Sequence, residues 1–293
     1  MHQPPRIWHW RGQAIAYRQA GEQGPAVLLI HGFGASSRHW RHNLPVLARQ
    51  ARVWAIDLIG FGASAKPHPD QLDYSFETWG TLVRDFCREV IGEPTHLIGN
   101  SIGCVVAMQA AVDEPEQVRS LVLINCSLRM LHERKLAEDS WLKQQLVPAF
   151  QRLLLWKPFG YFFFRQVAQP RAIRNALGQA YRNPAAIDDD LIELLLTPAQ
   201  DPGAADVFLR FVTYSQGPLP EDLLPHLTQP TLILWGQEDP WEPIALARDF
   251  AHYPAVVEFV ELPGAGHCPM DEAPELVNPQ LQRWLEAQTA VRS

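Results

Sequence analysis

A serine, an aspartate and a histidine occur in this chain where they could form a catalytic triad. Ser101 lies in Gly99-Asn100-Ser101-Ile102-Gly103, a G-x-S-x-G motif, and Asp239 and His267 follow it in the chain. A serine hydroxyl is a poor nucleophile alone, so it needs an adjacent base that a third group holds in place. The pattern predicts Ser101 as nucleophile, His267 as general base and then general acid, and Asp239 as the group that orients the imidazole.

Each member of this set also has a simpler interpretation. The Gly-Ser motif alone can be a turn without chemistry, and Asp239 can form a turn before Pro240. Glu238 is a second carboxylate on the same loop, and His267 can be an ordinary loop histidine. We favour the triad because the three residues occur in a workable order and each follows a predicted strand.

The segments that must position these residues are apolar runs that alternate with amphipathic helices. Continuous apolar runs of this kind are typical of strands buried on both faces of a parallel sheet. A hairpin is predicted first, and helices are expected through Trp40 and Leu47 with a Ser36 or Ser37 cap, over 76–91, after Ser101 and over 276–285. The pattern predicts an α/β fold, a mostly parallel doubly wound sheet. Its predicted strands are 7–10, 14–18, 26–30, 53–57, 95–100, 121–125, 230–236 and 256–262.

The alternation stops after Ser127 and resumes near residue 226. The segment between them shows no buried strand and is divided by Asn-Pro, Thr-Pro and Gly-Pro pairs. We therefore predict a core domain of residues 1–127 and 226–293 with an inserted helical cap over 128–225. Its expected helices are 140–155, 159–167, 171–180, 188–196 and 204–214.

The predicted cap is rich in aromatic residues, above all between residues 156 and 164. Helices that lie over a sheet need an apolar underside, which accounts for part of this set. Consecutive aromatic side chains on a helix point in several directions, so one buried stripe does not account for all of them. The excess favours a large apolar substrate or contact with a membrane surface. We predict substrate contacts at Trp156, Phe162, Phe163 and Trp241.

A loop rich in glycine follows the strand at 26–30 and could supply an oxyanion hole. Two backbone N–H groups are expected to bind the developing negative charge, one from Phe33 in this loop and one from Ile102 after the serine. Gly32 and Gly34 keep the loop open, and His31 is expected to shape it rather than to act as an acid or base.

Composition narrows the classes of partner. The chain has 293 residues, 47% hydrophobic and 19% charged, with a formal net charge of −7 and no basic cluster, so no nucleic-acid partner is expected. The four cysteines are far apart and predict free, mostly buried thiols in a reducing compartment. No signal peptide or spanning segment is visible, which predicts a soluble cytoplasmic protein, with peripheral membrane contact left open. No metal or cofactor is expected, and the oligomeric state stays open.

Several motifs together resemble the α/β-hydrolase superfamily over almost the whole chain, and the order Ser, Asp, His is the order of that superfamily. The motifs are His31-Gly32-Phe33-Gly34, Asp57-x-x-Gly60-x-Gly62-x-Ser64, Gly99-x-Ser101-x-Gly103, Gly236-x-x-Asp239 and Gly266-His267. Others look like the pheophytinase family and its chlorophyll-dephytylating relatives. These are Trp8-x-Trp10-Arg11-Gly12, Ala35-Ser36 with His39-Trp40-Arg41 and Asn43, Gly60-Phe61-Gly62, and Asp239-Pro240-Trp241-x-Pro243.

The resemblance implies a serine hydrolase of carboxylic esters, and within it cleavage of the phytol ester of a chlorophyll-type pigment. Haloalkane dehalogenases and epoxide hydrolases share the fold but need a carboxylate nucleophile, whereas position 101 is Ser. Asn125 leaves no alternative acid after its strand. Cys104 departs from the family, whose members commonly have glycine there, and could alter the floor of the pocket.

Three other functions stay open on the same fold. A small-ester carboxylesterase and a C–C bond hydrolase would use the same triad, and a ligand receptor would keep the triad with negligible turnover.

Overall fold

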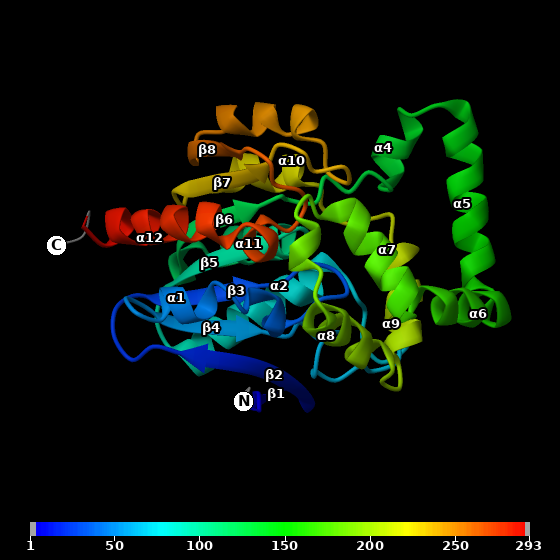
Figure 1. The fold of residues 1–293 in the computed structure, drawn as a ribbon, viewed down its shortest axis with the longest axis horizontal. Coiled ribbons are helices and arrows are strands. Elements are labelled where there is room, and N and C mark those ends of the chain that lie inside the picture. The colour runs from blue at the N-terminus through cyan, green and yellow to red at the C-terminus, as the bar shows by residue number, and fades with distance from the viewer. Residues whose placement is uncertain (1–3, 291–293) are drawn as a thin grey trace.

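A single sheet of eight strands forms the centre of the protein, which the computed structural model describes over residues 4–290. Its strand order is β1-β2-β4-β3-β5-β6-β7-β8 (Figure 1). β3 to β8 are parallel to one another, whereas β2 runs antiparallel to both of its neighbours, β1 and β4. The α/β prediction is confirmed. The strands are β1 (Arg6–Trp10), β2 (Gln13–Ala20), β3 (Ala26–Ile30), β4 (Arg52–Ile56), β5 (Thr95–Asn100), β6 (Val118–Ile124), β7 (Thr231–Gly236) and β8 (Val256–Leu262).

Helices cover both faces of this sheet, which explains why its central strands are continuously apolar. Alternate residues of β3 enter two cores, with Leu28 and Ile30 in one and Val27 and Leu29 in the other. The first core is closed by α2 (Phe76–Phe86) and α3 (Ile102–Asp113), and the second by α1 (Leu44–Leu47) and α12 (Pro274–Ala290). A short helix, α11 (Pro269–Glu272), precedes α12.

One predicted helix is wrong. The segment expected to be a single helix through Trp40 and Leu47 forms two short turns, η1 (Ser37–Trp40) and α1. Pro45 explains the break, because proline lacks an amide hydrogen and its ring clashes with the carbonyl four residues earlier. Ser36 does cap η1, since its hydroxyl accepts a hydrogen bond from Arg38 N at 3.3 Å. The other short turns are η2 (Cys87–Ile91), η3 (Pro115–Gln117), η4 (Pro184–Ala186), η5 (Leu224–His226), η6 (Ile244–Leu246) and η7 (Arg248–His252).

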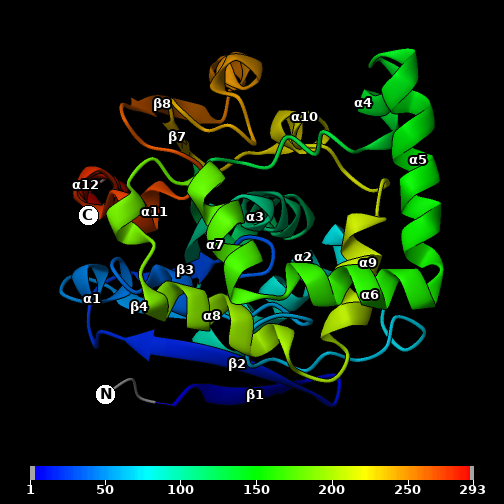
Figure 2. The same ribbon diagram turned by 45° about the vertical axis from the view of Figure 1, so that its right-hand side comes forward.

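Within residues 4–290, helices and short turns connect β6 to β7, and most of these helices lie together beyond the carboxyl ends of the strands (Figures 1 and 2). All five predicted helices are present, with two short ones added, α4 and α10. The domain limits at 128 and 225 stay a prediction, and we call residues 128–225 the cap. Its helices are α4 (Glu133–Ala137), α5 (Trp141–Leu155), α6 (Lys157–Val167), α7 (Pro170–Ala180), α8 (Asp189–Ala199), α9 (Ala204–Val212) and α10 (Pro220–Leu223). Within residues 4–290, no helix is long and apolar enough to cross a bilayer.

Candidate active site

Ser101 lies at the tight turn from β5 into α3. Its backbone has φ 56° and ψ −121°, a conformation that is strained for any residue with a side chain. The two flanking glycines are required by close packing: a Cβ on Gly99 would lie 2.4 Å from the Gly103 carbonyl oxygen, and one on Gly103 would lie 2.4 Å from the Ile30 carbonyl oxygen. The motif therefore forms a turn whose two glycine positions have no room for a side chain.

His267 and Asp239 form a hydrogen-bonded pair. His267 Nδ1 lies 2.7 Å from Asp239 Oδ2, and the aspartate side chain is fully buried. Burial acts to raise the pKa of Asp239, but the hydrogen bond and charge of His267, with bonds from the Glu242 N–H and the Asn125 amide, hold this pKa below its usual value. Glu238, the competing carboxylate, is exposed. The pair is thus built for a charged aspartate beside an imidazole.

The Asn100 side chain links the serine turn to the histidine loop. Its Nδ2 donates to the His267 carbonyl at 3.3 Å and to the Ile124 carbonyl at 3.2 Å. Since Asn100 is adjacent to Ser101 in the chain, these bonds hold the histidine loop beside the serine. The structure therefore places Ser101, Asp239 and His267 after the carboxyl ends of β5, β7 and β8, with Asp239 bonded to His267 and the serine turn bonded to the histidine loop.

Asn125 is a site residue that sequence reasoning missed. Its Nδ2 donates to Asp239 Oδ2 at 2.7 Å and to the Gly266 carbonyl at 3.2 Å, while its Oδ1 accepts from Gly236 N at 3.1 Å. The amide thus ties the aspartate loop to the histidine loop. The available signal was its position directly after a buried strand, the same place from which Ser101 and Asp239 were recognised.

Glu242 is a second missed residue. Its carboxylate accepts hydrogen bonds from Ser127 Oγ at 3.0 Å and Leu128 N at 2.9 Å, where the chain leaves the core for the cap. Burial raises the pKa of Glu242 to about 7. It sits close enough to His267 and Asp239 for their charges to act on it. The first residues of the cap are therefore bonded to the loop that carries the aspartate.

The predicted oxyanion loop lies against the serine. A Cβ on Gly32 would lie 3.1 Å from the Ser101 Cβ. His31 is fully buried, and its Nε2 accepts from Leu58 N at 3.0 Å, while its Nδ1 lies 2.7 Å from the Gly32 carbonyl. Burial lowers the pKa of His31, which favours a neutral ring that shapes the loop. Over residues 4–290, we find no protein acceptor for the N–H groups of Phe33 and Ile102, and their role as an oxyanion hole stays a prediction.

The four predicted substrate contacts lie in different places. Trp241 lies beside His267, with 5.1 Å between ring centroids and an angle of 54° between the ring planes. Phe163 contacts Phe150 and Phe208 and lines an apolar cavity of about 390 Å³ beneath α5. Trp156 and Phe162 are 62% and 53% exposed on the outer part of the cap. The structure brings Trp241 to the histidine and Phe163 to the cavity, and it leaves the other two at the surface.

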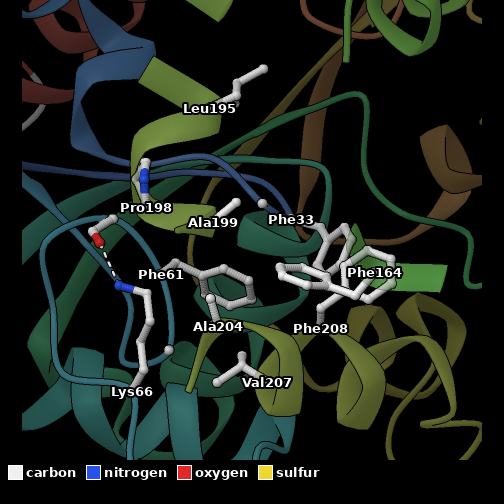
Figure 3. A pocket seen from close by; sticks show the side chains of 13 residues that line it. Phe33, Phe61, Lys66, Phe164, Leu195, Pro198, Ala199, Ala204, Val207 and Phe208 are labelled. Atoms are coloured by element: carbon white, nitrogen blue, oxygen red, sulfur yellow. Dashed lines mark hydrogen bonds between the residues drawn. The ribbon is translucent and has the colours of Figure 1, made fainter. Parts of the chain in front are cut away.

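A narrower apolar cavity, of about 70 Å³, lies between the oxyanion loop and the cap (Figure 3). The rings of Phe33, Phe164 and Phe208 group at one end, while Lys66 lies at the other, where its Nζ donates to the Gly62 carbonyl at 2.7 Å. Phe33 also stacks on Phe211 of α9, with 4.3 Å between centroids. The cap therefore covers the predicted oxyanion loop with aromatic side chains.

Comparison with known proteins identifies the family of this chain. Residues 27–280 match the alpha/beta hydrolase family. The chain belongs to that family. Chloroplastic pheophytinase of Arabidopsis thaliana is 28% identical over 93% of the chain, and this match spans 64% of pheophytinase, so the chain is similar to less than two thirds of that protein.

Two further alpha/beta hydrolase relatives are informative. The 2-hydroxy-6-oxo-6-(2'-aminophenyl)hexa-2,4-dienoic acid hydrolase of Metapseudomonas resinovorans is 26% identical over 90% of the chain and 84% of that enzyme. The crystal structure of a membrane phospholipase A, described as a bacterial virulence factor, is 30% identical with a TM-score of 0.76, over 97% of the chain and 86% of that structure. Within residues 4–290 of this alpha/beta hydrolase, no three His, Cys, Asp or Glu side chains gather as a metal-binding group.

Proposed function

We propose that this alpha/beta hydrolase is a serine hydrolase that cleaves carboxylic esters through an acyl-enzyme. The buried bond between His267 and Asp239 carries the proposal. Because Asp239 accepts from His267 Nδ1, the other ring nitrogen, Nε2, keeps the lone pair that a general base needs. The tautomer is thus set by the partner of Nδ1.

In the first step, His267 Nε2 takes the proton of Ser101 Oγ as that oxygen attacks the ester carbonyl. The carbonyl oxygen becomes negative and accepts hydrogen bonds from the Phe33 and Ile102 N–H groups. The tetrahedral intermediate then collapses, and the imidazolium of His267 protonates the departing alcohol. Asp239 stabilises the imidazolium through its buried negative charge.

In the second step, water replaces the alcohol. His267 takes a proton from the water, whose oxygen attacks the acyl carbon, and the same two N–H groups bind the oxyanion. Collapse releases the carboxylic acid and returns the proton to Ser101. The ester and one water are the only reactants consumed, and Ser101 and His267 return to their starting protonation states.

A bulky lipophilic ester, such as the phytol ester of pheophytin or chlorophyll, is the substrate that the cap supports best. The cavity of about 70 Å³ between the Phe33 loop and the cap and the cavity of about 390 Å³ within the cap are both lined mainly by apolar side chains. The names of two relatives, pheophytinase and membrane phospholipase A, agree with a lipophilic substrate. An apolar lining binds a hydrocarbon chain by removing it from water.

Single substitutions test the proposed catalytic residues. Ser101→Ala and Asp239→Asn should each lower kcat on a short nitrophenyl ester by about 10⁴-fold or more. Glu238→Gln and Ser140→Ala are matched controls, on the same loop and at an exposed serine, and should leave kcat unchanged. Equal activity of Ser101→Ala and the parent would overturn the proposal, whereas retained ligand binding without any turnover in the parent would indicate a receptor.

A panel of esters tests the proposal that the substrate is lipophilic. Release of phytol from pheophytin or chlorophyll is expected, and Phe163→Ala should slow long-chain esters more than short ones because Phe163 lines the cavity. Phe162→Ala, at an exposed neighbouring position, is the control for soluble substrates. Equal losses on long and short esters would count against the cavity as the acyl or alcohol site.

C–C bond hydrolysis is the second candidate, because one relative carries the name of an enzyme for a hydroxy-oxo-dienoic acid. The same panel should include such a substrate. Faster turnover of that substrate than of any ester would favour this second function.

A further inference from the structure

The outer part of the cap has an unusual surface. We call residues 141–167, which form α5, Trp156 and α6, the arm, and both views place it at the edge of the molecule away from the sheet (Figures 1 and 2). Eight of the fourteen large apolar side chains that are exposed over residues 4–290 belong to the arm. They are Trp141, Leu142, Leu146, Phe150, Leu153, Leu155, Trp156 and Phe162. Scattered exposed apolar residues are ordinary, but a concentration of this size marks an interaction surface.

The exposed leucines of α5 share one face. Leu142, Leu146 and Leu153 follow at intervals of four and seven residues, and Phe150 lies next to them on the helix surface. The adjoining face packs toward the rest of the cap, where Leu154 is buried and Gln151 donates to the Val212 carbonyl at 3.2 Å. Leu146 and Phe150 lie where the two faces meet, because they also line the cavity beside Gln151 and Leu154. α5 is therefore apolar on the side that faces solvent as well as on the side that faces the cap.

The charge of this region is opposite to that of the rest of the chain. Residues 140–187 contain seven Lys or Arg and no Asp or Glu, whereas the remaining residues contain 18 basic against 32 acidic residues. Arg152, Lys157 and Arg165 in the arm, and Arg171 just after it at the start of α7, are all exposed, and none forms an ion pair with another residue in 4–290. Cations that lack a partner in the protein are available to an anionic surface.

We propose that the arm docks on an anionic lipid surface, with the leucine face in the acyl region and the arginines and lysines at the phosphates. Exposed apolar residues beside Lys and Arg, with Trp at the boundary, are typical of helices that lie in a membrane interface. A second copy of the chain fits less well, because a two-fold dimer would set each basic surface against the same basic surface.

The arm also connects the lipid surface to the site, a part of the proposal that rests on the proposed function. The cavity of about 390 Å³ beneath α5 is lined by the surface residues Leu146 and Phe150 and by the interior residue Phe208. Phe208 lies 5.7 Å from Phe33, between ring centroids, in the oxyanion loop. An ester with a long hydrocarbon chain would pass from lipid to the oxyanion loop along apolar side chains.

Vesicle sedimentation with the full chain tests the docking. Binding to vesicles of phosphatidylglycerol mixed with phosphatidylcholine should be at least about tenfold tighter than to phosphatidylcholine alone, and added salt should weaken it. Arg152, Lys157, Arg165 and Arg171, changed together to Gln, should weaken it by about a hundredfold or more. The control changes Arg11, Arg49, Arg248 and Arg283 to Gln, which gives the same net charge with the arm intact, and should bind as the parent does.

The apolar face is tested in the same assay. Leu142, Leu146 and Leu153, changed together to Ser, should lose at least about tenfold in binding. The control changes Ile7, Leu246 and Val257 to Ser, three exposed apolar residues elsewhere on the surface, and should bind like the parent. Circular dichroism and thermal melting confirm that each variant is folded.

Three results would overturn the docking proposal: equal binding to neutral and anionic vesicles, equal losses in the arm variants and their controls, or a dimer that dissociates in the leucine variant while vesicles do not bind. Hydrolysis of a short soluble ester without vesicles separates the two proposals. Hydrolysis without vesicle binding rejects the docking alone, and vesicle binding without hydrolysis of any ester rejects the proposed function alone.

Discussion

α7–α8 and α5–α6 belong to the same cap, but only the first pair is joined to the core by buried polar groups. The Tyr181 hydroxyl, directly after α7, lies 2.8 Å from His39 Nε2 and donates to Asp271 Oδ2 at 3.0 Å. Arg41 bonds Asp271 at 2.8 Å and Asp188, the residue before α8, at 2.9 Å. Among residues 4–290, no comparable network joins the α5–α6 arm to the core, and the arm presents leucines and basic side chains to solvent.

The α7–α8 pair, which we call the anchored half of the cap, lies next to the loop that carries His267. His267 N donates to the Ala180 carbonyl at 2.9 Å, and Glu272 accepts from Gly266 N and Asn183 N, one on each side of that contact. The histidine loop and the end of α7 therefore support each other. The two halves therefore differ in what they contact: α7–α8 is bonded to the His267 loop, whereas α5–α6 carries the surface that we propose for docking.

The largest expected effect is on the buried ion pair of the anchored half. Arg41→Met leaves the fully buried Asp271 carboxylate without its cation, which typically costs about 3–5 kcal/mol of the free energy of unfolding. Arg152→Met in the arm is the control and should change that free energy by less than about 0.5 kcal/mol. Urea unfolding measures both, and similar losses would remove the distinction between the two halves.

A change of pH is expected to alter the free energy of unfolding by an intermediate amount, through His39. Burial lowers the pKa of His39 to about 4, whereas the unfolded chain has the ordinary value of about 6.5. As pH falls from about 6.5 to 4, the unfolded state takes up the proton first, so stability is lost over that window, by up to about 3 kcal/mol. Above about pH 6.5 both states are neutral and this contribution is constant.

His39→Gln should remove that share of the acid-side loss, because glutamine does not titrate. Urea unfolding at pH 7.5 and pH 4.5 gives the change in the free energy of unfolding between these pH values, for the parent and for the variant. Arg152→Gln should keep the parent's pH dependence, since residues 140–187 contain no His, Asp or Glu. A His39→Gln variant that loses as much stability in acid as the parent would show that another group dominates.

The smallest change in the free energy of unfolding is expected from a substitution on the exposed leucine face of the arm. Leu142→Ala should change the free energy of unfolding by less than about 0.5 kcal/mol, because its side chain is already in water. Leu177→Ala, at a buried leucine of α7, is the matched substitution and should cost about 2 kcal/mol or more. A large loss from Leu142→Ala would show that the leucine face is covered in solution, for example by a second copy.

Local sequence predicted most of the elements because their causes are local. The runs around Leu28 and Leu232 are apolar without interruption, and this pattern depends only on neighbouring residues. The single helix through Trp40 and Leu47 was wrong because Pro45 was given too little weight. Helices of about one turn, such as α4 and α10, were not predicted, because four or five residues are too few to show a helical period of apolar residues.

The candidate site was predicted in part for the same reason. Ser101, Asp239 and His267 each follow a strand, and their order along the chain was visible. Asn125 and Glu242 were missed because their partners are 114 residues away in the chain. Neither has a local motif, and only folding brings the amide to the aspartate and the carboxylate to the start of the cap.

The sequence by itself determined the parallel α/β sheet, the tight serine turn and the density of aromatic residues in the cap, because strand burial, glycine spacing and composition are written in adjacent residues. Only the tertiary structure decided which aromatic side chains face the cavity and which face water. That choice depends on how α5, α6 and α9 pack over the sheet. Phe162 and Phe163 are neighbours in the chain, yet one is exposed and the other lines a cavity, since consecutive side chains of a helix point about 100° apart.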